Sequence, residues 1–145
     1  MILPLIMLFA LSSGHEITQL QVPLHADPRR AAELRCVFRM AGQRLHSVKW
    51  YRDLHEIFRY NPSQKTQIRL FNVTGVMVQG GACETQRCEA GGGGGGAGAC
   101  EQRCEVRVMP PPQATRAAYT CEVSTEGPMF QIARQTKHMT VVGEN

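Results

Sequence analysis

The chain has 145 residues, of which 43% are hydrophobic, and it carries a formal charge of +4. This length suits one globular domain with a targeting segment or an insertion, and the hydrophobic fraction is sufficient for a core. The basic residues are scattered along the chain, and no nucleic-acid-binding motif accompanies them. We therefore expect no nucleic acid as a partner, whereas an acidic protein surface stays open as one.

The first predicted element is an apolar run from Ile2 to Leu11, followed by small residues at positions 12–14. This order is typical of the hydrophobic region and cleavage zone of a secretory signal, although no Lys or Arg precedes the run. The run is shorter than a membrane span, and no later stretch is long and apolar enough to be one. We expect residues 1–14 to be a signal peptide and the protein to be secreted or held at the cell surface, with no membrane-spanning segment in this chain.

After the leader, apolar residues recur at every second position, which is the period of a half-buried strand. Segments with this alternation lie at residues 32–40, 46–52, 104–109, 117–123 and 135–142. Turn residues such as Ala41-Gly42 and Asn61-Pro62 separate them, and the prolines at 110–112 exclude a central strand there. The pattern predicts an all-β fold, either an antiparallel sandwich or a barrel.

Residues 82–105 break this pattern, because two near-copies, ACETQRCE and ACEQRCE, flank a glycine tract. Consecutive glycines have no side chains to bury and lose the most backbone entropy on folding. We interpret residues 82–105 as a low-complexity insertion between two strands, produced by local duplication.

The insertion contains four cysteines, Cys83, Cys88, Cys100 and Cys104. Their spacing is looser than that of a paired zinc knuckle, and export favours oxidation, so local disulfides or no function at all are preferred to a metal site. We expect no metal ion.

The most specific combination in the chain is Cys36, the single tryptophan at position 50, and Tyr119-Thr120-Cys121. It resembles the pattern of immunoglobulin-type sandwiches. The resemblance implies a disulfide between Cys36 and Cys121 on facing sheets, with Trp50 packed against it and Tyr119 at the corner before the second cysteine. The expected fold is an immunoglobulin-like β-sandwich of the variable type over residues 16–142, with the Gly/Cys-rich insertion before strand E.

Two longer stretches, SVKWYRDLHEIFRY at 47–60 and YTCEVSTEGPMF at 119–130, narrow the resemblance. They are similar to the first immunoglobulin domain of the beaten path family of insect neural cell-surface and secreted proteins. The family pattern is close to VKWYKDxxEFxRY followed by YxCEVSxExPxF. The second motif is the more specific, because immunoglobulin domains in general have no reason to follow their second cysteine with it.

The family resemblance implies an extracellular adhesion and recognition domain that acts in axon guidance. Its partner would be a cell-surface immunoglobulin-superfamily receptor of the sidestep type, bound heterophilically and without a cofactor. The sequence has no nucleophile motif, no paired carboxylates and no phosphate-binding loop, so we expect no enzyme. Two other interpretations stay open: a soluble immune-type or glycan-binding immunoglobulin domain, and a module in which the four inserted cysteines bind a metal ion.

Successive side chains of a strand point to opposite faces of the sheet. Lys49, Tyr51 and Glu122 alternate with the core residues Trp50 and Cys121, so we expect them to point away from the core. Exposed aromatic residues beside charges on one sheet face are typical of a protein interface. The predicted partner-binding residues are Lys49, Tyr51, Phe58, Tyr60 and Glu122. In addition, Asn72-Val73-Thr74 fits the N-glycosylation acceptor, so Asn72 is the predicted glycan site if it faces solvent.

Overall fold

The computed structural model describes residues 14–73, 75–84 and 100–142, which form strands and no helix. The strands are β1 (Glu16–Gln21), β2 (His25–Ala26), β3 (Ala32–Arg39), β4 (Leu45–Arg52), β5 (His55–Tyr60), β6 (Ile68–Leu70), β7 (Met77–Glu84), β8 (Gln102–Met109), β9 (Thr115–Thr125) and β10 (Ile132–Val141). Within these described ranges there is no long apolar helix of the kind that crosses a membrane. The predicted signal peptide lies outside them, apart from Gly14.

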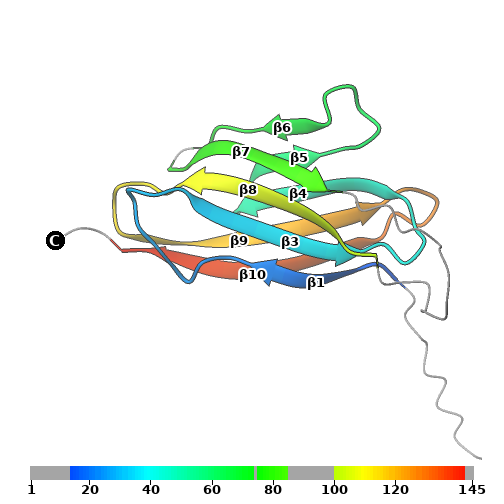
Figure 1. The fold of residues 1–145 in the computed structure, drawn as a ribbon, viewed down its shortest axis with the longest axis horizontal. Coiled ribbons are helices and arrows are strands. Elements are labelled where there is room, and N and C mark those ends of the chain that lie inside the picture. Colours follow the sequence, from blue (N-terminus) through cyan, green and yellow to red (C-terminus); the bar gives the residue numbers. More distant parts are fainter. Residues whose placement is uncertain (1–13, 74, 85–99, 143–145) are drawn as a thin grey trace, which may run out of the picture.

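The strands form two sheets that pack face to face (Figure 1). One sheet has the order β1-β3-β8-β7 and is called the β3 sheet below; the other has the order β2-β10-β9-β4-β5-β6 and is called the β9 sheet. The short β2 runs parallel to β10, and the other paired strands of the described chain are antiparallel. This is the strand order of a variable-type immunoglobulin sandwich, so the predicted fold class is confirmed.

The core forms because each strand turns its apolar residues to one side. In β3, Leu34 and Cys36 are completely buried, while the alternating residues Glu33 and Arg35 face outward. The largest fully buried side chains come from both sheets: Trp50, Tyr119, Phe38, Phe58, Leu34 and Ile57. Alternation with period two therefore gives the sandwich one apolar face per sheet.

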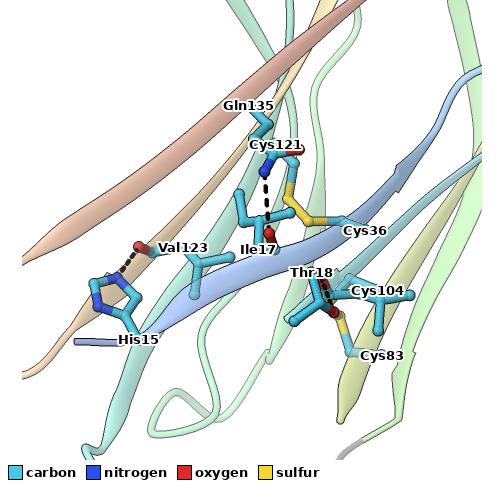
Figure 2. Close-up of a disulfide and its surroundings, with 10 residues drawn as sticks. His15, Ile17, Thr18, Cys36, Cys83, Cys104, Cys121, Val123 and Gln135 are labelled. Atoms are coloured by element: carbon cyan, nitrogen blue, oxygen red, sulfur yellow. Dashed lines mark hydrogen bonds between the residues drawn. A yellow bond between two sulfur atoms is a disulfide. The ribbon is translucent and has the colours of Figure 1, made fainter. Parts of the chain in front are cut away.

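A disulfide between Cys36 and Cys121 joins the two sheets, with a Cα–Cα distance of 6.4 Å (Figure 2). Trp50 is the register partner of Cys121 and is completely buried. Tyr119 lies two positions before Cys121 on the same inner face and is 1% exposed. Its burial raises the pKa of its hydroxyl, and the charge of Arg52 nearby acts in the opposite direction.

A second disulfide joins Cys83 and Cys104, which lie directly opposite each other in β7 and β8 with a Cα–Cα distance of 4.1 Å (Figure 2). Residues 82–84 and 102–105 were predicted to belong to the insertion, but they are paired residues of β7 and β8. Cys104 continues the inner face of Val106 and Val108, and this alternation explains its place in β8. The glycine tract and Cys88 lie outside the described residues.

These disulfides bear on the alternative of a metal-binding module. Zinc binds thiolates, whereas the sulfur atoms of Cys83 and Cys104 are bonded to each other, and Cys100 is also disulfide-bonded. No group of three or more metal-binding side chains comes together in the part of the chain that the structure describes. The arrangement favours the oxidised, disulfide-linked state over a metal site.

Two side-chain hydrogen bonds connect residues 15 and 17, near the beginning of the described chain, to the β9 sheet (Figure 2). His15 Nε2 donates to the carbonyl of Val123 at 2.8 Å, and Gln135 Nε2 donates to the carbonyl of Ile17 at 3.0 Å. Strand β1 belongs to the β3 sheet, so these bonds close the side of the sandwich where the edges of the two sheets meet.

Candidate protein-binding surface

Ion pairs cover the outer face of the β3 sheet. Within the described residues they are Glu33–Arg107 at 2.9 Å, Arg35–Glu105 at 2.7 Å, Glu84–Arg103 at 2.7 Å and Arg39–Glu101 at 3.2 Å. Each pair joins residues from neighbouring strands or their ends, and three of the pairs are direct register partners. The charges on this face therefore cancel locally.

The outer face of the β9 sheet has a different composition. Strand pairing sets five charged side chains in one row across it, in the order Arg134, Glu122, Lys49, Arg59, Arg69. Glu122 bonds to Arg134 at 2.7 Å, and Arg59 bonds to Glu56 at 2.6 Å. Lys49 and Arg69 have no ion pair within the described ranges.

Tyr51 lies in the next row of this face, opposite Thr120 on β9 and Glu56 on β5. Its side chain is half-buried, and this burial is the largest cause that raises the pKa of the Tyr51 hydroxyl. The carboxylates of Glu122 and Glu56 raise the pKa further. The hydroxyl is therefore neutral at physiological pH and can donate a hydrogen bond to a partner.

An apolar patch adjoins this row, at the loop between β9 and β10 (residues 126–131). Met129 is 65% exposed, Phe130 68% and Ile132 57%. Ile132 begins β10 opposite Ser124, so it lies on the same outer face as Arg134. The patch and the charged row therefore form one surface, which we call the β9-sheet surface.

Hydrogen bonds hold this loop to the body of the domain. Gln131 N donates to Thr125 Oγ1 at 2.9 Å, and Thr125 N donates to the carbonyl of Gln131 at 3.0 Å. Glu126 N donates to the carbonyl of Arg44 at 2.9 Å, which connects the loop to the turn before β4. A loop held in this way presents its exposed side chains with less ordering cost on binding.

The ring of Phe130 lies against the backbone of Gly127 at the tip of this loop. A Cβ atom added at Gly127 would lie 2.7 Å from the Phe130 ring. A glycine is therefore needed at this position for the ring to lie where it does.

The structure places the sequence-predicted residues on both sides of the β9 sheet. Lys49 and Tyr51 are half-buried on the outer face, and Glu122 is on the same face but only 6% exposed. Phe58 and Tyr60 are a correction, because they are 0% and 8% exposed and point into the core. Phe58 is paired with Trp50 and Tyr60 with Val48. Paired residues of neighbouring strands point to the same face of a sheet, so both side chains point inward with these core residues.

Sequence reasoning missed six residues of this surface: Met129, Phe130, Ile132, Arg134, Arg59 and Arg69. A signal for the first two was present, since an apolar pair in a short loop between two strands has no core to enter. Arg134 and Ile132 carried no comparable signal, because their face depends on the register between β9 and β10.

The predicted glycan site, Asn72, is exposed in the segment that follows β6. This position is compatible with a glycan, and glycosylation itself stays a prediction. A shallow groove of about 630 Å³ lies elsewhere, between β1 and β10, and is lined by Thr18, Gln19, Glu33, Gln135 and Lys137 among others. Its amide and hydroxyl groups can bind polar ligands, but no nucleophile is paired with a base there.

The chain matches no family model, and comparison with curated proteins gives no match. Among solved structures it is similar to murine CRIg, with 14% identity, a TM-score of 0.46, and coverage of 88% of this chain and 98% of that chain. A likeness at this level carries no statement about function. The strand order, the inter-sheet disulfide and the buried tryptophan define an immunoglobulin-like domain, a fold whose members commonly serve recognition and adhesion outside cells.

Proposed function

We propose that this chain is an extracellular recognition domain that binds another protein through the β9-sheet surface. The observation that carries the proposal is the exposed apolar patch of Met129, Phe130 and Ile132, with Arg134 in the next row of the same face. Tyr51 lies on the other side of the charged row. Tyrosine, arginine and buried apolar anchors dominate the energetics of protein interfaces. Contiguous exposed apolar groups on an otherwise polar domain are also characteristic of binding sites.

The opposite face is the weaker candidate. Its arginines and glutamates are already paired with each other, so a partner would have to replace existing ion pairs rather than form new ones. Its large exposed apolar residue in β7 is Met77, at 63% exposure. Single exposed apolar residues are ordinary on protein surfaces.

For the partner, we propose an immunoglobulin-superfamily receptor of the sidestep type, bound heterophilically in axon guidance. The support is the likeness of two sequence motifs to the beaten path family. Glu122 and Phe130 are residues of the more specific motif, and both belong to the β9-sheet surface. Tyr119, Cys121 and Val123 of this motif pack in the core, whereas Phe130 is 68% exposed and is better explained by binding than by core packing.

A binding screen tests this proposal. The oxidised, purified domain is measured against the extracellular regions of sidestep-type receptors by biolayer interferometry. We expect at least one receptor to bind, and we expect Tyr51→Ala and Phe130→Ser each to weaken binding by about tenfold or more. Met77→Ala, a substitution of an exposed residue on the opposite sheet, is the matched control and should change affinity by less than about twofold.

Circular dichroism of each variant checks that the fold is retained. We expect retention because Phe130 and Met77 are exposed and Tyr51 lies on the outer face, outside the core. Binding to a glycan array in the absence of binding to any of these receptors would overturn the proposal in favour of the glycan-binding alternative. Binding that Met77→Ala weakens, while Tyr51→Ala and Phe130→Ser leave it unchanged, would move the interface to the other sheet.

A further inference from the structure

The two outer faces of the sandwich differ in how their charges are balanced. On the β3 sheet, four arginines and four glutamates of the described chain are joined in ion pairs. On the β9 sheet, the described outward-facing residues include five basic ones and two acidic ones. The basic residues are Lys49, Arg59, Arg69, Arg116 and Arg134, and the acidic ones are Glu56 and Glu122.

Three of these basic residues are direct neighbours on adjacent strands. Lys49 on β4 lies opposite Arg59 on β5, and Arg59 lies opposite Arg69 on β6. We call these three residues the cationic row. Like charges directly opposite each other destabilise a strand pair.

Only part of this repulsion is relieved within the domain. The charge of Arg59 is neutralised by an ion pair with Glu56 at 2.6 Å. The guanidinium carbon of Arg59 also lies 5.5 Å from the centroid of the Phe71 ring. The carboxylate nearest Lys49 in the register belongs to Glu122, and Glu122 bonds to Arg134 instead. The arrangement therefore costs stability in the free domain, and a negative surface brought against it would recover that cost.

We infer that the partner presents an acidic protein surface to the cationic row, next to an apolar pocket that receives Phe130. This inference rests on the proposed recognition function and specifies the chemistry of its partner. A protein fits better than an anionic polysaccharide, because Met129, Phe130 and Ile132 expose apolar area on the same surface and a sulfated sugar chain cannot bury it. The carboxylates steer association, and the apolar contact supplies most of the binding energy.

The first test uses a peptide and needs no receptor. Amide chemical shifts of the full chain are followed while hexaglutamate or hexalysine is added at low ionic strength. We expect hexaglutamate to shift the amides of Lys49, Arg59 and Arg69 in a saturable way and to leave β3 and β8 unchanged. The shifts should disappear at about 0.5 M salt, where the Debye length is a few ångströms.

Variants assign the effect to the cationic row. Lys49→Ser and Arg69→Ser should each weaken hexaglutamate binding. Arg30→Ser is the control and should leave binding unchanged. Arg30 lies in the turn before β3, and this turn is at the end of the sandwich opposite the β9–β10 loop (Figure 1). Shifts of equal size on the β3 sheet, or no saturable shift in β4, β5 and β6, would overturn the inference.

The second test uses any receptor found in the screen. We expect the association rate to fall by about tenfold or more between 50 and 500 mM salt. Lys49→Glu and Arg69→Glu should slow association to a similar extent, and Arg30→Glu, which changes the net charge equally, should not. If neither salt nor Lys49→Glu changed the association rate, the inference of an acidic partner surface would be wrong, and the proposed recognition function would still stand. A third outcome would assign the cationic row to an anionic polysaccharide instead. In that outcome the domain binds heparin, Lys49→Glu abolishes this binding, and Lys49→Glu has no effect on binding to any receptor.

Discussion

The guanidinium of Arg134 donates two hydrogen bonds, 2.7 and 3.2 Å long, to one carboxylate oxygen of Glu122. Glu122 is 6% exposed and lies between Arg134 and Lys49 in the register of the β9 sheet. Arg134 thus bonds Oε2 of this carboxylate, and the ammonium group of Lys49 has no ion-pair partner within the described ranges. The chemistry that the surface offers to a partner is therefore set by which neighbour Glu122 bonds.

Gly81 and Gly80 provide a matched pair for the packing between β7 and the core. A Cβ at Gly81 would lie 2.6 Å from the Phe58 ring and 2.8 Å from the backbone carbonyl of Glu105, whereas a Cβ at Gly80 would meet nothing within 4 Å. We expect Gly81→Ala to lower the free energy of unfolding by about 1–3 kcal/mol, because neither the buried ring nor the backbone of β8 can move freely. Gly80→Ala should change it by less than about 1 kcal/mol. Urea unfolding of both variants is the measurement, and equal effects would contradict this packing.

The two described disulfides should contribute unequally to stability. Cys36–Cys121 spans 85 positions and Cys83–Cys104 spans 21. In the chain-entropy model the first contributes about 4.5 kcal/mol and the second about 3.3 kcal/mol, since a longer closed loop restricts the unfolded chain more. Replacing each pair with alanine and measuring urea unfolding should reproduce this order. A larger loss on removal of Cys83–Cys104 would show that strain or packing outweighs the loop term.

Stability should fall at alkaline pH because of Tyr119. Burial raises the pKa of this hydroxyl above its value in the unfolded chain, which is about 10. The contribution of the neutral side chain is therefore complete below about pH 10 and is lost as the pH rises towards the pKa of the folded state. Urea unfolding at pH 8 and pH 10.5 measures the loss, and Tyr119→Phe should reduce it. The same pH dependence in the variant would assign the effect to other groups.

Asn72 should carry an N-linked glycan when the chain passes through a eukaryotic secretory pathway. The residue is exposed and begins an Asn-Val-Thr acceptor, whereas Asn61 is followed by Pro62 and serves as a non-acceptor control. Mass spectrometry before and after glycosidase treatment should show a glycan that Asn72→Gln removes. Asn61→Gln should leave the mass shift in place. Absence of any glycan on the wild-type chain would show that the site is not used.

Much of the fold follows from the alternation of apolar and polar residues in the sequence. Cys36, Trp50, Tyr119 and Cys121 each occupy an inward position of an alternating strand, and the structure buries all four. Alternation determines which side of a strand is apolar, and the pattern of cysteines and tryptophan indicates which strands face each other. This information is local, so it can be read without knowing the register.

The surface could be predicted only in part, because it depends on register and on loop geometry. A register shift between Trp50 and Tyr51 makes Glu56 the partner of Tyr51 and keeps Phe58 opposite Trp50. A bulge of this kind is not visible in the sequence, and without it the alternation along β5 would turn Phe58 and Tyr60 to the outer face. Arg134 and Ile132 lie in a strand whose residues at 132–138 are nearly all exposed, so alternation there gives no sign of which side faces a partner.

Hydrogen exchange of the domain, alone and in complex with a receptor from the screen, tests the recognition surface most directly. We expect the complex to slow exchange in β4, β9, the start of β10 and the loop at residues 126–131, and to leave β3 and β8 unchanged. Slower exchange confined to β3, β8 and β7 would contradict the account, because it would place the partner over the paired charges of the opposite sheet.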